Sequence, residues 1–177
     1  GAGGVGLLLT QMIKMRGGHV IATVSTEEKA VLARAAGADE VILYSRDDFV
    51  MEVARITHGA KLPVVYDSVG KDTFAGSVEC LRSRGYMVLY GQSSGRVDPV
   101  DPQLLNSKGS LFLTRPTMMN YTETREELLV RANDIYAWAA AGKLNARVGL
   151  TLPLEQAADA HRALEGRKTT GKVILVP

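Results

Sequence analysis

The sequence predicts an α/β fold in which helices cover both faces of a doubly wound parallel sheet. Helical and strand-like segments alternate at roughly 20–25 residues per unit, and the strand-like segments are apolar on both faces, as buried parallel strands are. An antiparallel sandwich would instead alternate polar and apolar residues and have no helices between its strands. With 46% hydrophobic and 23% charged residues, the 177-residue chain can build one core, or one domain and part of a second.

Each element of the first 120 residues can be assigned from periodicity and end signals. Apolar residues recur at helical spacing from Val5 to Ile13. Ser25 and Glu28 form a capping box for a second helix, which runs through Ala36. The helices end at Gly17, Gly37 and Gly59, and a fourth covers residues 72–82. The expected strands are 19–24, 41–44, 62–67, 86–91 and 110–114, with a loop at Pro99 and Pro102 before the last.

The pattern changes after residue 122. Thr124 and Glu127 are expected to cap a long helix that ends at Gly142. A strand at 147–152, a helix at 154–165 and a strand at 172–176 follow. The helix at 154–165 carries His161 on its apolar stripe, so we expect a packed histidine there. Because this tail does not continue the earlier alternation, we assign it to a second domain.

Composition excludes several classes of protein. The 21 basic and 19 acidic residues are spread along the chain, which argues against a nucleic-acid-binding protein. Cys80 is the one cysteine and the three histidines are scattered, so we expect no disulfide and no metal site within these residues. There is no run of about 18 apolar residues, so we expect no membrane span and a cytoplasmic protein.

The first six residues, GAGGVG, stand directly before an amphipathic helix. In such a loop, Gly1 permits a tight turn, Gly3 lets backbone N–H groups approach a diphosphate, and Gly6 allows close packing of helix and sheet. The pattern favours nucleotide binding over a purely structural turn. A glycine-rich turn of this kind normally follows a strand, so we expect the first strand of the sheet to be absent from the chain.

The end of the next strand indicates which nucleotide binds. A site for NAD(H) places Asp or Glu there to hold the ribose 2′-hydroxyl, whereas this strand ends in Thr23, Val24, Ser25 and Thr26. Lys29 lies one turn into the following helix, and a cation beside a hydroxyl suits a 2′-phosphate. NADP(H) is therefore favoured. The alternative is that Ser25 only caps the helix and Lys29 is solvated, and the adjacent Glu27 and Glu28 weaken the positive field.

Seven motifs together carry a resemblance to a known family. They are GAGGVG (1–6), TVSTEEK (23–29), YDSVG (66–70), YGQSSG (90–95), KGSLFLTRP (108–116), TREEL (124–128) and GRKTTGKVILVP (166–177). In this order they resemble the zinc-independent, zeta-crystallin-like quinone oxidoreductases of the medium-chain dehydrogenase/reductase superfamily. The resemblance implies a Rossmann-type NADPH-binding domain at 1–120. Residues 121–177 would then be the junction helix and the return segment of a GroES-like substrate domain.

The resemblance also implies a set of cofactor-binding residues, with no metal ligand and no identifiable catalytic residue. Those expected at the diphosphate are Ala2, Gly3, Gly4 and Val5. Those expected around the 2′-phosphate and the adenosine are Ser25, Lys29, Tyr44 and Gly70. Those expected on the nicotinamide side are Gly91, Gln92, Ser93, Ser94, Phe112, Leu113 and Thr114. Arg167 would reach back toward the cofactor from the tail.

Several of these residues have a structural alternative. Tyr44 is also consistent with a half-buried aromatic residue at a strand end, and Ser93-Ser94-Gly95 with an ordinary loop. Phe112 fits a core or an interface position, since the strand at 110–114 is a candidate edge strand for a homodimer. Asp67, at the end of a strand, is expected to cap a turn, and Cys80 to be a core residue.

The function that follows is hydride transfer from NADPH to a quinone or an activated enone, for which the protein supplies orientation and a dry pocket. Two alternatives stay open. One is a 2-enal or enoyl reductase of the same superfamily, and the other is a non-catalytic NADPH-binding module. The chain by itself is expected to be inactive, because most of the substrate domain lies outside it.

Overall fold

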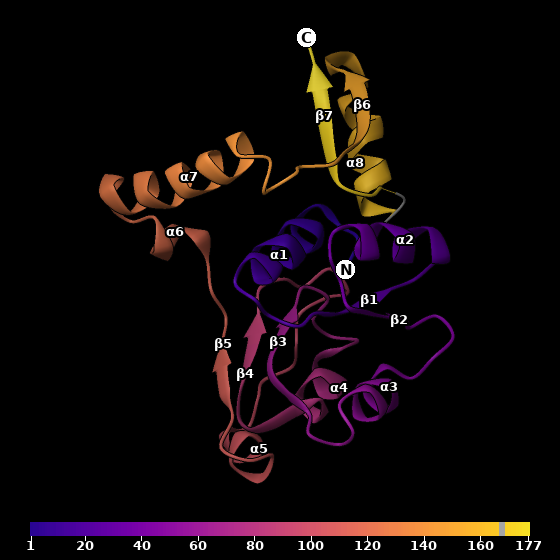
Figure 1. Cartoon of the computed structure of the whole chain (residues 1–177), viewed down its shortest axis with the longest axis vertical. Helices are drawn as coiled ribbons and strands as arrows, with labels where there is room; N and C mark the ends of the chain where they lie inside the picture. The colour runs from indigo at the N-terminus through magenta and orange to yellow at the C-terminus, as the bar shows by residue number, and fades with distance from the viewer. Residues whose placement is uncertain (167–168) are drawn as a thin grey trace. The chain divides into compact units, whose positions relative to one another are not determined.

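A computed structural model describes residues 1–166 and 169–177. The chain divides into two compact units (Figure 1). The first unit consists of Gly1–Asp47 and Val130–Pro177, and the second of Asp48–Leu129. The strands that pair within each unit are parallel. The predicted α/β fold is therefore confirmed.

The first unit begins with a helix, which is followed by a βαβ arrangement. Helix α1 (Gly4–Met15) precedes strand β1 (Ile21–Val24), and helix α2 (Glu27–Ala35) connects β1 to the parallel strand β2 (Glu40–Leu43). Ala30 and Ala33 of α2 are completely buried, because small side chains let the helix lie close to the strands. The core that they share with both strands includes Leu7, Val20, Ala22, Val24 and Leu43.

The carboxyl-terminal part of this unit is a second βαβ arrangement. Strands β6 (Val148–Pro153) and β7 (Lys172–Val176) pair in parallel. The 3₁₀ turn η1 (Leu154–Gln156) and helix α8 (Ala157–Glu165) connect them. A single bridge joins Gly3 to Gly171, so the approach to β7 runs beside the glycine-rich loop.

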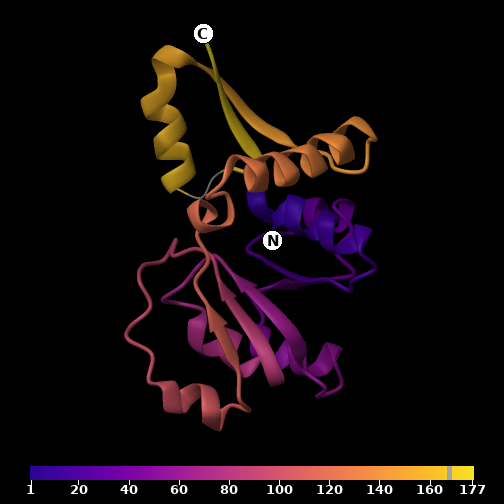
Figure 2. The same cartoon turned by 90° about the vertical axis from the view of Figure 1, so that its left-hand side faces the viewer.

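The second unit is built on three strands, whose arrows lie side by side and point the same way (Figure 2). Their order is β3 (Leu62–Asp67), β4 (Leu81–Leu89) and β5 (Phe112–Thr114). The short helices of this unit are α3 (Phe49–Ile56), α4 (Phe74–Glu79), α5 (Pro102–Ser107) and α6 (Met118–Tyr121), and helix α7 (Arg125–Ala140) begins here. Its core contains Phe74, Val78, Leu81, Met87 and Leu111.

Several residues begin or end helices as the sequence predicted. The Thr124 hydroxyl accepts a hydrogen bond from Glu127 N at 3.2 Å, and Thr124 N donates to the Glu127 carboxylate at 3.3 Å. This is a reciprocal capping box at the start of α7. Gly37 and Gly59 adopt positive φ after α2 and α3, as helix-ending glycines do.

Other predictions of element ends were wrong. Thr26, and not Ser25, caps α2, because its hydroxyl accepts from Lys29 N at 3.3 Å. The predicted loop around Pro102 contains helix α5, with Pro102 in its first turn and Asp101 as its cap. Helix α4 ends at Glu79 and β4 already begins at Leu81, so the predicted helix 72–82 is too long.

His161 was expected to be packed, and it is exposed. The buried face of α8 is formed instead by Ala160, with Ala157 and Ala163 half buried. The predicted apolar stripe assumes an α-helix that begins at Leu154. Residues 154–156 instead form the 3₁₀ turn, whose different period changes which face of the following helix is buried. Within the described residues, no helix is both long and apolar enough to cross a membrane.

Candidate cofactor site

The three spaced glycines of the first loop differ in the space around them. A Cβ atom on Gly1 would lie 2.9 Å from Ala22 Cβ, and one on Gly6 would lie 2.4 Å from the Gly1 carbonyl oxygen. A Cβ atom on Gly3 would meet nothing within 4 Å. Packing within the protein therefore explains Gly1 and Gly6 but leaves open space at Gly3. That space is where a ligand would approach the backbone in a loop of this kind.

The first turn of α1 is suited to an anion. Gly3 is the N-cap residue and offers no side-chain cap, and the turn contains no acidic residue. The N–H groups of Gly4, Val5 and Gly6 have no partners within the helix, and the helix dipole favours negative charge at this end. Val5 is exposed and Ala2 is buried. The four residues predicted at the diphosphate thus form one continuous turn that presents backbone donors, so they fit a diphosphate.

The segment before β7 passes close to this turn. A Cβ atom on Gly4 would lie 3.0 Å from the carbonyl oxygen of Gly171. Gly171 has a φ of +74°, which a residue with a side chain rarely adopts. The sequence analysis did not single out Gly171, although a glycine at the start of an apolar strand was a usable signal. Arg167 lies outside the described residues.

Ser25, Lys29 and Tyr44 come together at the carboxyl ends of β1 and β2. The Lys29 ammonium donates to the Ser25 hydroxyl at 3.3 Å. The Ser45 hydroxyl donates to the Ser25 carbonyl at 2.8 Å, which ties the two strand ends together. Tyr44 follows β2, donates its N–H to the Val24 carbonyl and has a half-exposed ring. The predicted cation and hydroxyl are therefore adjacent, and Ser45 is a supporting residue that the sequence analysis missed.

The acidic residues near this strand end have other partners. The Glu27 carboxylate lies 3.8 Å from the Arg46 guanidinium. A hydrogen bond from the Thr26 hydroxyl holds the pKa of Glu28 below its usual range. The two carboxylates that follow β1 therefore both interact with neighbouring side chains.

In the second unit, Asp67 organises the loop that follows β3. Its buried carboxylate accepts hydrogen bonds from Val69 N at 2.7 Å and Gly70 N at 3.0 Å. It also accepts from the hydroxyls of Thr73 at 2.7 Å and Ser77 at 2.8 Å. All four bonds are local, so the prediction that Asp67 caps a turn is confirmed. A carboxylate with these partners is a structural group and not an available base.

The loops after β3 and β4 are joined by hydrogen bonds. Ser93 N donates to the Ser68 carbonyl at 3.1 Å, and both the amide and the hydroxyl of Ser94 donate to the Val69 carbonyl. A Cβ atom on Gly70 would lie 2.7 Å from Gly95 O, and one on Gly91 would lie 2.4 Å from Ser68 O. Only glycine permits this approach. Gly70, Gly91, Ser93 and Ser94 therefore form one rigid surface at the carboxyl ends of the strands, with Gln92 exposed at its tip.

Strand β5 carries the last group of predicted residues. The Phe112 ring stacks on Tyr86 of β4, with centroids 4.5 Å apart and planes 9° apart, and both rings are about half exposed. Leu113 faces the opposite side and packs on the core of the unit. Thr114 is exposed at the end of the strand. Phe112 is thus neither a core residue nor fully free, and it lies on an open sheet face.

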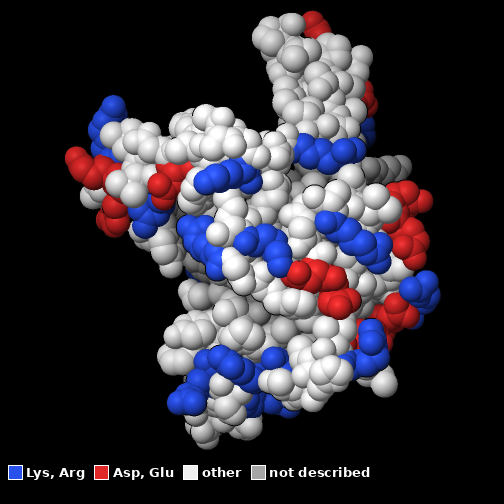
Figure 3. Space-filling model, in the orientation of Figure 1, with Lys and Arg blue, Asp and Glu red and all other residues white. Residues whose placement is uncertain are grey.

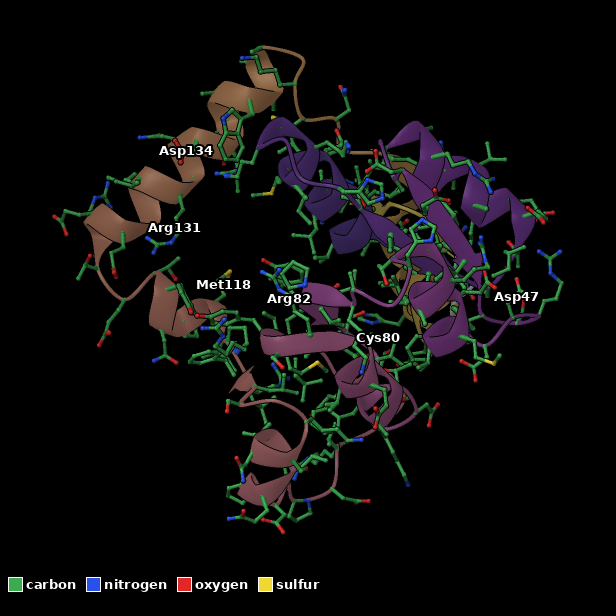
Figure 4. All side chains as sticks on the ribbon, turned by 60° about the horizontal axis from the view of Figure 1, so that its bottom comes forward. Asp47, Cys80, Arg82, Met118, Arg131 and Asp134 are labelled. Carbon is green, nitrogen blue, oxygen red and sulfur yellow. The ribbon has the colours of Figure 1, made fainter. Side chains whose placement is uncertain are left out.

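Cys80 is a core residue, as predicted, and Figure 4 labels it among the packed side chains. Burial raises the pKa of its thiol to about 11. A thiol with that pKa is protonated near neutral pH and is a poor nucleophile. In the part of the chain that the structure describes, no group of three His, Cys, Asp or Glu side chains is placed to hold a metal ion.

Comparison with known proteins identifies the class. A family model described as zinc-binding dehydrogenase matches residues 36–175. The chain belongs to this dehydrogenase family, and its predicted place among the quinone oxidoreductases of the medium-chain dehydrogenase/reductase superfamily is confirmed.

Individual relatives can then be named. Quinone oxidoreductase 1 of Escherichia coli (strain K12) is 46% identical over 99% of this chain and 54% of its own length. The 2-haloacrylate reductase of a Burkholderia species is 43% identical over 99% of this chain and 53% of its own length. The crystal structure of E. coli quinone oxidoreductase complexed with NADPH superposes with a TM-score of 0.96, at 46% identity, over 99% of this chain and 55% of that chain. The chain thus spans about half the length of the curated relatives that it matches.

Proposed function

We propose that this chain forms the NADPH-binding part of a quinone oxidoreductase. The observation that carries the proposal is the pairing, within one unit, of open space at Gly3 with the Lys29–Ser25 contact at a strand end without an acid. The first feature admits a diphosphate, and the second favours a 2′-phosphate over a free 2′-hydroxyl. The likeness to a quinone oxidoreductase crystallised with NADPH supports the same assignment.

The proposed residues would contact different parts of NADPH. The turn from Ala2 to Val5 holds the diphosphate through backbone donors, and Ser25, Lys29 and Tyr44 surround the 2′-phosphate and its ribose. In the second unit, the resemblance to the family assigns Gly70 to the adenosine half of the cofactor, and residues 91–94 and 112–114 to its nicotinamide side. Arg167 would add a second cation. On this assignment residues 1–120 form the cofactor domain and residues 121–177 belong to the junction and the substrate domain.

When bound, NADPH would supply a hydride, that is two electrons and one proton, and a second proton from solvent would complete the hydroquinone. Because a quinone accepts a hydride readily, the chain need not supply a strong acid. Its own contribution is to bind, to orient and to exclude water.

Reduction of an activated alkene is a second candidate function. It is favoured by the 43% identity to a protein named 2-haloacrylate reductase, whose name denotes an alkene beside a carboxylate. The same cofactor residues would serve both reactions. The two substrates differ in what must be held around the acceptor, and the residues for that task would lie in the substrate domain.

Calorimetric titration of the chain with NADPH and with NADH tests the cofactor assignment. We expect tight binding of NADPH and weak binding of NADH. Lys29→Ala should weaken NADPH by about ten-fold or more and leave NADH nearly unchanged, since one charge-assisted contact is worth about 1.5–3 kcal/mol. Arg34→Ala, which removes a cation from the same helix, is the matched control and should change neither. Equal weakening of both nucleotides by Lys29→Ala would contradict the 2′-phosphate assignment.

Activity is then tested in a protein that joins this chain to its substrate domain. Consumption of NADPH is followed at saturating cofactor with a benzoquinone and, separately, with 2-chloroacrylate. Turnover of the quinone supports the first function, and selective turnover of the acrylate supports the second. Tight NADPH binding with no turnover of either acceptor identifies a non-catalytic NADPH-binding module.

A homodimer through the segment 110–114 belongs to the same proposal. Strand β5 is the last strand in the order β3-β4-β5, and Phe112 and Tyr86 present apolar surface beside it. An open strand edge with exposed aromatic residues favours pairing with a second copy. A single cysteine, which can form no disulfide within the chain, is consistent with the proposal of a cytoplasmic protein. Sedimentation of the protein with and without Phe112→Lys tests the dimer.

A further inference from the structure

A basic groove lies at the amino ends of β3 and β4, the opposite edge of the sheet from the candidate cofactor loops. It is lined by Gly59, Ala60, Lys61, Arg82, Ser83 and Arg84, and it has a volume of about 620 Å³. All six residues belong to the second unit. We call this feature the amino-edge groove. None of its lining residues is assigned to the cofactor, and none carries a negative charge.

The pairing of β3 with β4 brings the basic residues together from two separate segments. Leu62 lies opposite Leu81, and Leu62 N donates to the Cys80 carbonyl at 2.9 Å. Lys61 precedes Leu62 and Arg82 follows Leu81, so the two cations flank this pair. The next paired residues are Val64 and Tyr86. The residues from Arg82 to Gly85 therefore bulge out of the strand (Figure 4 labels Arg82).

The backbone holds the cationic residues in fixed positions. Arg84 has a φ of +59°, and its N–H donates to the Gly109 carbonyl at 2.8 Å. Lys61 also has a φ of +59°, and its N–H donates to the Thr57 hydroxyl at 3.1 Å. Left-handed conformations of residues with side chains are uncommon and persist only where the surroundings fix them. Apart from Gly59, the groove residues that adopt this conformation are Lys61 and Arg84, and both carry a positive charge.

The positive charge of the groove is not neutralised within the described residues. The side chains of Lys61, Arg82 and Arg84 form no ion pair or hydrogen bond there. The Glu79 carboxylate pairs with Lys108, and the Asp48 carboxylate accepts hydrogen bonds from Val50 N and Met51 N at the start of α3. On the face shown in Figure 3, basic side chains gather where β4 and β5 begin, without acidic side chains among them. Three exposed cations around one concave surface raise the local concentration of anions.

We propose that the amino-edge groove binds a small multivalent phosphate anion. Two guanidinium groups two residues apart can each form paired hydrogen bonds to phosphate oxygens, Lys61 adds a point charge, and the Ser83 hydroxyl adds a donor. The rigid bulge provides the preorganisation that such recognition requires. The site is separate from the proposed function, since it shares no residue with the cofactor assignment.

Titration of the whole chain with inorganic pyrophosphate, with circular dichroism as a check on folding, tests the proposal. We expect pyrophosphate to bind, and the double variant Arg82→Gln/Arg84→Gln to bind it at least about ten-fold more weakly, as expected for lost charge-assisted contacts. Both arginines are exposed, so folding should be unchanged. The double variant Arg34→Gln/Arg125→Gln removes the same charge elsewhere and should bind as the parent chain does.

Three results would overturn the proposal. The first is the absence of pyrophosphate binding by the parent chain. The second is loss of binding in Gly3→Ala with full binding in Arg82→Gln/Arg84→Gln, because the anion would then occupy the glycine-rich loop. The third is equal binding of citrate and pyrophosphate, which would indicate attraction of any multivalent anion and not recognition of phosphate.

Discussion

Substituting Gly3 and Gly6 separately would distinguish binding from packing in the glycine-rich loop. At Gly3 an added methyl group meets nothing within 4 Å, and the residue has a φ of −75°, which alanine adopts freely. A gain of about 0.4–1 kcal/mol from the less flexible unfolded chain opposes the loss from alanine as an N-cap, which is of similar size. We expect Gly3→Ala to change the free energy of unfolding by less than about 1 kcal/mol.

At Gly6 the same methyl group would lie 2.4 Å from the Gly1 carbonyl oxygen, so the backbone must move. Overpacking of this kind costs about 1–3 kcal/mol. We therefore expect Gly6→Ala to destabilise the chain by about 1–3 kcal/mol.

The direct effect on NADPH affinity should come from the substitution at Gly3, whereas the larger effect on stability comes from the substitution at Gly6. In Gly3→Ala the methyl group occupies the space into which a diphosphate would fit, so affinity should fall by about ten-fold or more at unchanged stability. Chemical denaturation and calorimetric titration of both variants separate the two effects. Undiminished NADPH affinity in Gly3→Ala would refute our account of the loop, as would unchanged stability in Gly6→Ala.

Three further predictions concern the remainder of the fold. Asp67→Asn should cost about 1 kcal/mol, because the amide still accepts from the backbone and donates to the hydroxyls, whereas Asp67→Ala should cost about 3 kcal/mol or more in denaturant unfolding. The pKa of Cys80, raised to about 11, predicts negligible alkylation by iodoacetamide in the folded chain and rapid alkylation in urea. Fast modification of the folded chain would contradict its burial. The ammonium of Lys14, and then the amide of Val20, hold the pKa of Asp39 below its usual range. Its contribution to stability is therefore present above the unfolded pKa and is lost as the pH falls through the folded one, so Asp39→Asn should flatten the acid side of a plot of Tm against pH.

Most of the fold was accessible from the sequence because local signals and tertiary packing agree. Strand 62–67 was predicted with its observed bounds, since a continuous apolar run is flanked by Gly59 and by the turn at Asp67. The capping box at Thr124 was also predicted, because the two side chains that form it are three residues apart and need no distant partner. Signals of this kind depend only on neighbours in the chain.

The errors arose where two local choices were chemically equivalent. Ser25 and Thr26 are both good N-caps, and the choice depends on where β1 ends. The hydrogen bond from Ser45 to the Ser25 carbonyl holds Ser25 with the strand, so Thr26 becomes the cap. Pro102 was equally ambiguous, because proline ends helices in their interior and begins them in the first turn, where Asp101 supplies the cap.

The two candidate sites differ in whether they depend on neighbours in the chain or on contacts between distant segments. The glycine-rich loop can be predicted because residues close together in the chain create its geometry. The spacing of its glycines indicates which of them pack against the protein and which one leaves space for a ligand. The amino-edge groove has no such motif. Lys61 and Arg82 become neighbours only because Leu62 pairs with Leu81, and the bulge that presents Arg84 exists only in that register. A shift of one residue in the pairing of β3 and β4 would send these side chains to opposite faces and remove the groove, without changing any local sequence signal.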